Sequence, residues 1–91
     1  MKFQWDEAKA AKSLVKHGVQ FEEAKTVFDD PRYVDFYDPD HSDDEKRFIR
    51  LGRSRAGRLL LVSYTERGNS VRLISAREAT PRERKAYEQG L

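Results

Sequence analysis

Two apolar segments in the second half of the chain, 58–65 and 71–77, constrain the fold more than any other feature. Both are rich in leucine, valine and isoleucine, as strands are, and the first is the more apolar and is therefore predicted to be central. Residues 66–69 between them include Gly68 and Asn69, which readily adopt the positive backbone angles of a hairpin turn. The pattern predicts an antiparallel hairpin at the centre of a sheet.

The segment after the hairpin predicts a short helix with strong start signals. Thr80 is a favourable N-cap, Pro81 suits the first helical position, and Glu83 stands where a capping-box carboxylate is expected. The helix is predicted to end near residue 89 and to dock through Tyr87, because most of its other side chains are polar. Its basic residues are expected at the surface: Arg82, Arg84 and Lys85.

The first half of the chain predicts two helices followed by a strand and an acidic loop. Asp6 is a suitable N-cap for a helix ending near residue 17, and Gly18 can close that helix in the left-handed conformation. A second helix is predicted over 21–28, since Pro31 disfavours helical geometry at the residue before it. The remaining predicted segments are a strand over 32–37, an acidic loop over 38–45 and a strand over 46–53.

The first helix carries an apolar stripe and a basic stripe. The apolar stripe has helical spacing and predicts the buried face of the helix: Ala8, Ala11, Leu14 and Val15. The basic stripe fits either a solvated face or a binding surface: Lys9, Lys12 and Lys16.

Together these elements predict one domain over 1–91 with an α+β fold. The expected order is two N-terminal helices, a four-stranded antiparallel sheet and a short C-terminal helix. Residues 1–5 are expected to form either a short edge strand or an extended lead-in. The helices are expected on one face of the sheet, so that the opposite face is available for a ligand or a partner.

Charge is distributed unevenly along the chain, although the net charge is only +2. Residues 1–45 carry 6 Lys and Arg against 12 Asp and Glu, whereas residues 46–91 carry 12 against 4. This asymmetry favours a face that binds a polyanion, and arginine suits phosphate because its guanidinium donates two parallel hydrogen bonds. The alternative is that the two halves neutralise each other across the fold.

Several classes of protein and site are disfavoured by composition. The chain has no cysteine, which excludes disulfides and thiolate metal sites. The longest uninterrupted apolar run, 59–62, is too short for a signal peptide or a membrane span, so we expect a cytoplasmic protein. The loop over 38–45 superficially resembles a calcium loop, but its sixth position is not glycine and its twelfth is Ile49. We therefore expect no metal and no cofactor.

Short motifs with a characteristic order and spacing extend over almost the whole chain. The first half contains Phe3-x-Trp5-Asp6-x-x-Lys9, Lys16-His17-Gly18-Val19-x-Phe21-Glu22-Glu23-Ala24 and Phe28-x-Asp30-Pro31. The second half contains Glu45-x-Arg47, Gly52, Gly57-Arg58, Tyr64-Thr65-x-Arg67, Arg72-x-Ile74-Ser75-Ala76-Arg77-x-Ala79 and Glu83-Arg84-x-x-Tyr87. In these motifs the chain resembles the BrnT family. One departure is Gln20, a poor N-cap where the family often has serine.

The resemblance implies a RelE-like fold and a ribonuclease toxin of a type II toxin–antitoxin module. The implied partner is a BrnA-type antitoxin, a ribbon-helix-helix protein that binds DNA. Contact with operator DNA would then be indirect, through the antitoxin. A different class of function, a non-catalytic module that binds nucleic acid or antitoxin through the same basic face, is the alternative.

Metal-independent RNA cleavage needs a base for the 2′-hydroxyl, cations for the phosphorane and an acid for the leaving oxygen. Arg77 is the leading cation, because a strand-end arginine beside a helix N-terminus makes an anion site. Arg50 and Arg72 are predicted to project from one face. The predicted catalytic residues are Arg72, Arg77, Arg84, Tyr87 and Arg50, and the predicted RNA-binding residues are Tyr64, Arg82 and Lys85.

The sequence leaves the general base open. His17 lies at a helix end, where a cap is the simpler role, and His41 lies in the acidic loop. Glu83 fits a capping carboxylate better than a base. The remaining alternative is catalysis mainly by positioning and charge stabilisation.

Overall fold

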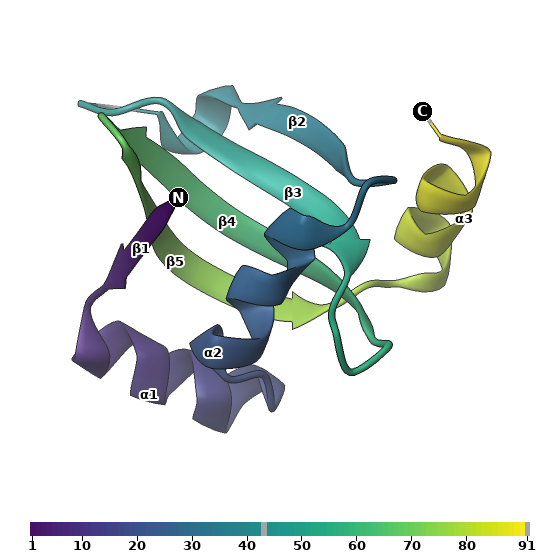
Figure 1. Ribbon diagram of the computed structural model, residues 1–91, viewed down its shortest axis with the longest axis horizontal. Coiled ribbons are helices and arrows are strands. Elements are labelled where there is room, and N and C mark those ends of the chain that lie inside the picture. The colour runs from purple at the N-terminus through teal and green to yellow at the C-terminus, as the bar shows by residue number, and fades with distance from the viewer. Residues whose placement is uncertain (43, 91) are drawn as a thin grey trace.

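The computed structural model describes residues 1–42 and 44–90, which form three α-helices and a five-stranded mixed sheet (Figure 1). The strands are β1 (Lys2–Trp5), β2 (Val34–Asp38), β3 (Arg47–Arg53), β4 (Leu59–Arg67) and β5 (Ser70–Glu78), in the order β1-β5-β4-β3-β2. The helices are α1 (Glu7–His17), α2 (Phe21–Ala24) and α3 (Pro81–Gln89), with short 3-10 turns η1 (Lys25–Asp29) and η2 (Pro39–His41). No helix in the described part of the chain is long and apolar enough to cross a membrane.

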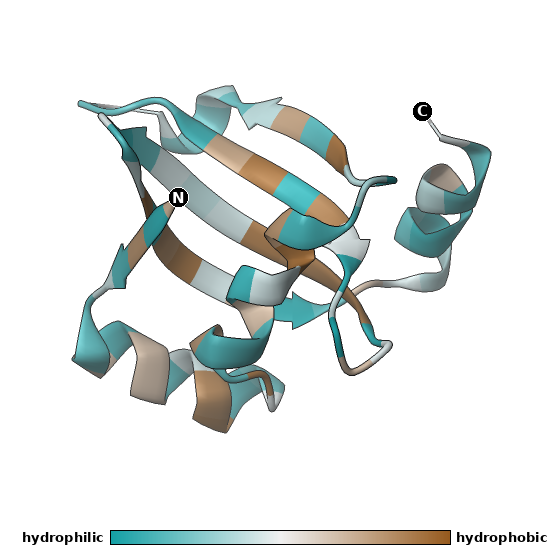
Figure 2. Ribbon diagram, in the orientation of Figure 1, coloured by the Kyte–Doolittle hydropathy of each residue, from teal (hydrophilic) through white to brown (hydrophobic). Residues whose placement is uncertain are grey.

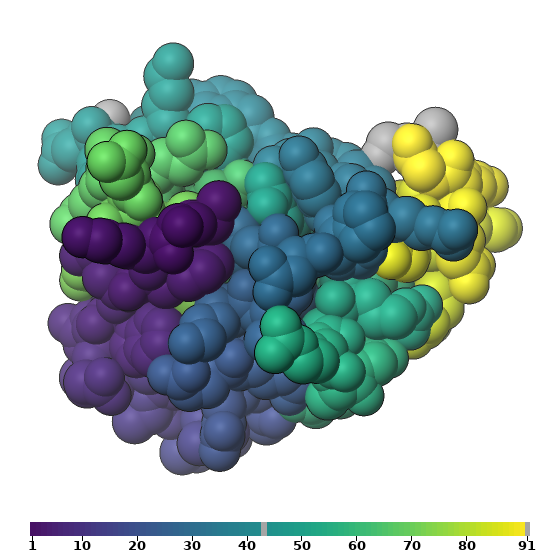
Figure 3. Space-filling model, in the orientation of Figure 1, coloured from purple at the N-terminus to yellow at the C-terminus, as the bar shows by residue number. Residues whose placement is uncertain are grey.

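The predicted four-stranded antiparallel sheet is wrong in one respect, because β1 adds a fifth strand parallel to β5. Phe3 pairs with Val71 in register, and the Lys2 amide donates to the Asn69 carbonyl at 3.4 Å. Figure 3 shows these first residues packed beside the β4–β5 hairpin. A parallel pairing between residues almost 70 positions apart leaves no local signal, which is why the sequence left residues 1–5 ambiguous.

The main core lies between the sheet and the layer formed by α1, α2 and η1. Figure 2 shows apolar positions along the central strands and on the helical segment that crosses them. Phe3 and Trp5 of β1 pack against this core from its edge. The buried members are Val19, Phe21, Ala24, Val27, Leu60, Val62, Tyr64, Val71, Leu73 and Ala76.

The predicted second helix over 21–28 is one turn of α-helix that continues as η1. Gln20 precedes it without a side-chain cap, as its residue type suggested. Where the helix changes geometry, the Thr26 hydroxyl donates to the Glu23 carbonyl at 2.7 Å. The tighter turn ends at Asp29, close to the predicted boundary before Pro31.

The predicted buried face of α1 is wrong. Val15 is 88% exposed, whereas Ser13 is buried and contacts β5. The Ser13 hydroxyl accepts from the Ala76 amide at 3.3 Å and donates to the Ala76 carbonyl at 3.2 Å. Pairing of β1 with β5 stops at Leu73, so these groups of Ala76 lie beyond the end of β1. A polar residue therefore takes the packing position that the apolar stripe was expected to fill.

The helix α3 does not share a sheet face with α1 and α2, contrary to prediction. It packs over the opposite face at one end of the sheet, and Figure 1 shows it apart from the other helices. Its predicted start is confirmed: Thr80 and Glu83 form the reciprocal capping box, with Pro81 in the first turn. The second core consists of Val34, Leu51 and Leu59, with Leu61, Ala79, Ala86 and Tyr87 packed against it. Beyond α3, this face of the sheet is open.

Candidate functional site

A row of polar side chains crosses the open face of the sheet. Adjacent strands place Gln4 opposite Arg72, Arg72 opposite Thr65, and Thr65 opposite Arg47. Asp38 of β2 stands opposite Arg47 and completes the row. Residues directly opposite each other in a sheet project from the same face, so the row brings two arginines onto one surface.

Arg72 lies between Gln4 and Thr65 in this row and is partly buried. Its side-chain hydrogen bond is a long one of 3.5 Å to Gln4 Oε1. Among residues 1–42 and 44–90, no carboxylate lies within ion-pair distance of its guanidinium. The pKa of Glu45 is lowered chiefly by hydrogen bonds from Arg67, and to a smaller extent by the charge of Arg72. Arg72 therefore retains donors for a ligand.

A cavity of about 230 Å³ lies beside Arg72. It opens between the polar row, the N-terminal part of α1 and the end of the acidic loop. Within it Arg67 forms a bidentate pair with Glu45, at 2.7 and 2.6 Å. The cavity is lined by Lys9, His41, Asp44, Glu45, Arg47, Thr65, Arg67, Arg72 and Ile74.

A β-bulge in β5 determines which arginines share this face. Ser63 pairs with Ser75 but Tyr64 pairs with Leu73, so Ile74 is an extra residue on β5. Simple alternation predicts that Leu73 and Ser75 share a face and that Ala76 faces away from them. Instead Leu73 and Ala76 both belong to the main core. The bulge therefore brings Arg77, five residues after Arg72, to the open face.

Arg77 already has an anionic partner. Its guanidinium donates to both carboxylate oxygens of Glu83, at 2.9 and 2.8 Å. Glu83 also accepts from the Thr80 amide at 2.9 Å, so one carboxylate serves the cap and the arginine. The hydrogen bonds from Arg77 lower the pKa of Glu83, and those to Glu83 raise the pKa of Arg77. The predicted anion site beside the helix start thus holds a side-chain carboxylate.

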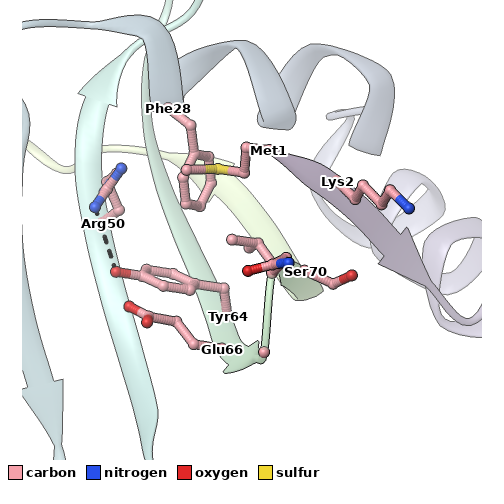
Figure 4. Close-up of a pocket in the computed structure, with 10 residues that line it drawn as sticks. Met1, Lys2, Phe28, Arg50, Tyr64, Glu66 and Ser70 are labelled. Carbon is pink, nitrogen blue, oxygen red and sulfur yellow. Dashed lines mark hydrogen bonds between the residues drawn. The ribbon is translucent and has the colours of Figure 1, made fainter.

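Arg50 lies on the helix-covered face, opposite to Arg72, so the prediction that the two share a face is wrong. Its Nε and Nη2 donate to Asp35 at 2.7 and 2.8 Å, and its guanidinium lies 3.8 Å from the ring centroid of Tyr33. Tyr64 donates its hydroxyl to Asp35 at 2.9 Å. Figure 4 shows Arg50 and Tyr64 side by side.

Tyr64 is only 1% exposed, which leaves no ring surface for stacking on a base. Burial raises the pKa of its phenol, and the hydrogen bond to Asp35 raises it further. Together with Arg50, Tyr64 lines a second cavity of about 560 Å³ between Phe28 and Met1 (Figure 4). The Tyr64 hydroxyl and two nitrogens of Arg50 bind Asp35, so the two predicted site residues in this cavity already have an anionic partner.

The remaining predicted residues lie on α3. Tyr87 is partly buried and donates its hydroxyl to Asp30 at 2.6 Å, with its ring 5.6 Å from the guanidinium of Arg53. Burial, followed by the hydrogen bond to Asp30, raises the pKa of Tyr87. Three basic side chains are exposed on this helix: Arg82, Arg84 and Lys85.

A model of the family described as "Ribonuclease toxin, BrnT, of type II toxin-antitoxin system" matches residues 5–83. The chain belongs to the BrnT family. The resemblance noted from the sequence motifs is therefore confirmed. The BrnT family is one of ribonuclease toxins, and its type II class implies an antitoxin partner and an RNA target.

A solved BrnT structure has the same fold. The crystal structure of the Brucella abortus ribonuclease toxin BrnT superposes with a TM-score of 0.64 at 23% sequence identity. The alignment covers 88% of this chain and 97% of the Brucella chain. No curated protein matches the sequence.

Two arginines at turns of this BrnT chain pair with carboxylates of the first half that lie outside the acidic loop over 38–45. Arg58 donates to Glu23 at 3.0 and 2.6 Å, and Arg55 lies 3.4 Å from Asp29. Arg67 pairs with this loop through Glu45, and its side chain is exposed.

Two side chains that were not among the predicted site residues, Arg47 and Thr65, lie on the open face beside Arg72. His41, in the acidic loop, also lines the cavity beside Arg72 while its side chain remains exposed. Its Nδ1 lies 2.9 Å from Asp38 Oδ2. Cross-strand register brings these residues to Arg72, and the sequence alone does not specify register.

Metal ligands do not gather in the part of the BrnT chain that the structure describes. Within those residues, no group of three or more His, Asp or Glu side chains is placed to hold a metal ion. The sixth position of the predicted acidic loop, residue 43, lies outside the described residues.

Proposed function

We propose that the chain is a metal-independent endoribonuclease that cleaves RNA and thereby inhibits translation, with its reacting centre on the open face at Arg72. The observation that carries this proposal is the guanidinium of Arg72. It has no carboxylate partner in residues 1–42 and 44–90, and it lies beside Arg47 and Lys9. In a protein with 16 acidic residues, such an unpaired arginine suits a ligand that is itself an anion.

The proposed role of Arg72 is to bind the phosphodiester that is cleaved. Attack of the 2′-hydroxyl on phosphorus places additional negative charge on the phosphate oxygens, and a guanidinium fork stabilises that charge. Arg77 projects from the same face and is the second proposed cation, with RNA phosphate competing against Glu83 for its guanidinium. The proposed contacts to flanking RNA come from α3: Arg82, Arg84, Lys85 and Tyr87.

Arg50 and Tyr64 are proposed to act indirectly. They lie on the other face of the sheet, where their polar atoms bind Asp35. Their proposed role is to stabilise the packing of β2, β3 and β4, without contact to RNA.

His41 is the proposed proton-transfer group. It lines the cavity beside Arg72, and Asp38 orients its ring by contact with Nδ1 at 2.9 Å. A carboxylate at one imidazole nitrogen leaves the other nitrogen to exchange a proton with the ligand. This proposal requires neither a metal nor a cofactor.

The proposed partner is a BrnA-type ribbon-helix-helix antitoxin, with operator DNA contacted only through that antitoxin. Support comes from the family's type II class and from the excess of basic residues in the second half of the chain. An acidic antitoxin segment would compete with RNA for the same cations. We propose that the toxin acts in the cytoplasm.

RNA cleavage by the purified chain tests the enzymatic proposal. Cleavage is expected in the presence of EDTA, and an RNA with a 2′-O-methyl group at the scissile nucleotide should resist. Arg72→Ala is expected to lose activity by about a hundredfold or more, the scale of losing a charge-stabilising donor. Arg55→Ala is the matched control, because Arg55 is 79% exposed and lies at a turn away from the row.

Expression in cells tests the toxin proposal separately. Growth arrest is expected from the chain alone, with rescue by the product of an adjacent antitoxin gene. Full RNA cleavage by a folded Arg72→Ala variant would show that the reacting centre does not lie on the open face at Arg72. RNA that is bound but left intact by the wild type would instead indicate a non-catalytic binding module.

A further inference from the structure

Two buried polar atoms on the open face have no hydrogen-bond partner within the described residues. They are Nε of Arg47 and Oγ1 of Thr65. The two residues stand directly opposite each other on β3 and β4, and yet these atoms do not bond to each other. Thr65 is only 4% exposed. Buried donors left unpaired cost free energy, so two such atoms side by side indicate a site that a ligand completes.

Both side chains line the cavity of about 230 Å³ described above. Arg72 from β5 and Lys9 from α1 line it as well, so that Arg47, Arg72 and Lys9 share this lining with Thr65. The acidic side chains at its rim are Asp44 and Glu45, of which Glu45 is neutralised by the bidentate contact with Arg67. The lining of the cavity is therefore rich in hydrogen-bond donors and positive charge.

A phosphate group would supply the hydrogen-bond acceptors and the negative charge that match the donors and cations of this cavity. It carries negative charge and several acceptor oxygens, and can accept from a guanidinium Nε, a hydroxyl and a second guanidinium together. A metal ion is disfavoured by the same cations. A planar carboxylate has only two oxygens to offer donors that come from three strands and a helix.

We propose that this cavity binds one phosphate group of the RNA backbone, held by Arg47, Thr65 and Arg72. The inference rests on the proposed function and adds two residues to its site. Arg47 and Thr65 bind the phosphate and orient it, while Arg72 is shared with the reacting centre. The hydrogen bonds that the fold leaves unmade on this face are completed by RNA.

Thr65→Val gives a sharp test, because valine keeps the shape of threonine and lacks the hydroxyl. The probes are inorganic phosphate and a short 2′-O-methyl RNA, with binding followed by NMR shifts of the full chain. Wild-type shifts are expected at the cavity residues, and Thr65→Val should weaken RNA binding about tenfold, as for loss of a hydrogen bond to a charged group. Its urea midpoint should be unchanged or higher, since an unpaired buried hydroxyl has been removed.

A second variant and a control variant accompany this test. Arg47→Lys keeps the charge but removes Nε, and is expected to weaken RNA binding to a similar extent. Ser63→Ala is the matched control on the same strand and face, outside the cavity lining, and should bind RNA as the wild type does.

The outcomes separate this inference from the proposed function. Unchanged RNA binding by Thr65→Val and Arg47→Lys, or phosphate shifts confined to the Arg50 cavity, would overturn the subsite even if the wild type cleaves RNA. Cavity shifts that respond to both variants, in a protein that cleaves no RNA, would support the subsite and overturn the enzymatic proposal. A response to an acidic peptide but not to RNA would also overturn the phosphate assignment.

Discussion

The arginines of this chain differ in what occupies their donors. Arg50 and Arg58 each direct a guanidinium fork at one carboxylate, Asp35 and Glu23 respectively. Within the part of the chain that the structure describes, Arg72 has only a long contact to a neutral amide. A guanidinium with a bidentate partner must break two charge-assisted hydrogen bonds before it can bind RNA, whereas Arg72 loses almost nothing. Availability, rather than number, decides which arginine can bind a phosphate.

The Asp35 cluster on the helix face is expected to serve stability alone. Tyr64→Phe removes the hydroxyl that donates to Asp35 and leaves the Arg50 fork in place. Loss of one buried hydrogen bond to a charged group should lower the free energy of unfolding by about 1.5–3 kcal/mol. Urea denaturation measures this change, and the folded variant should cleave RNA at the wild-type rate.

The matched control for this prediction is Tyr37→Phe. Tyr37 is 51% exposed on the edge strand β2, so its stability and activity should stay at wild-type values. A folded Tyr64→Phe variant that fails to cleave RNA would indicate that the reacting centre lies on the helix-covered face of the sheet.

At the scale of elements, the sequence predicted correctly the features whose contacts lie close together along the chain. The Thr80 to Glu83 capping box predicted the start of α3 correctly, because all its contacts lie within four residues. The parallel pairing of β1 and the bulge at Ile74 depend on distant partners and have no local signal. Strict alternation past Ile74 reverses the face of every later residue in β5. The same unknown register hid Arg47 and Thr65 from the predicted site.

The attachment of α3 is predicted to depend on pH through Glu83. Its folded-state pKa lies below the ordinary value of 4.5, chiefly because Arg77 donates to it. Stability from this group is therefore complete above about pH 4.5, and is lost as the pH falls through the lower folded-state pKa. Glu83→Gln keeps an acceptor for the Thr80 amide but loses the charge that pairs with Arg77, and should cost up to about 1 kcal/mol at neutral pH. Its urea midpoint should also fall less on acidification than that of the wild type.

Glu88→Gln is the control for this prediction, because Glu88 is exposed on the same helix and makes no ion pair within the described residues. It should keep the full acid sensitivity of the wild type. Equal acid sensitivity in Glu83→Gln and the wild type would contradict a role for the Arg77–Glu83 pair.

At the scale of the whole molecule, the two halves do neutralise each other, but incompletely. Ion pairs that link acidic residues of the first half to arginines of the second are Asp35–Arg50, Asp29–Arg55, Glu23–Arg58 and Glu45–Arg67. Of the described cations without such a partner, Arg47 and Arg72 lie on the open face, and Arg82, Arg84 and Lys85 lie on α3. The neutralisation alternative is therefore correct for the four paired arginines, and a polyanion-binding face stays a prediction for the others. Composition gave the excess of positive charge, whereas strand register decided where that excess lies.

RNA binding should therefore be sensitive to salt through the unpaired arginines. For single-stranded nucleic acid, log K falls with log salt by about 0.7 per neutralised phosphate. Arg72→Gln removes one such contact, so the slope measured with 2′-O-methyl RNA should be shallower by about 0.7. Arg55→Gln, at an exposed turn and already beside Asp29, should leave the slope unchanged. Equal effects of the two substitutions would mean that RNA binding depends on the net charge of the protein. Arg72 would then make no specific contact with phosphate.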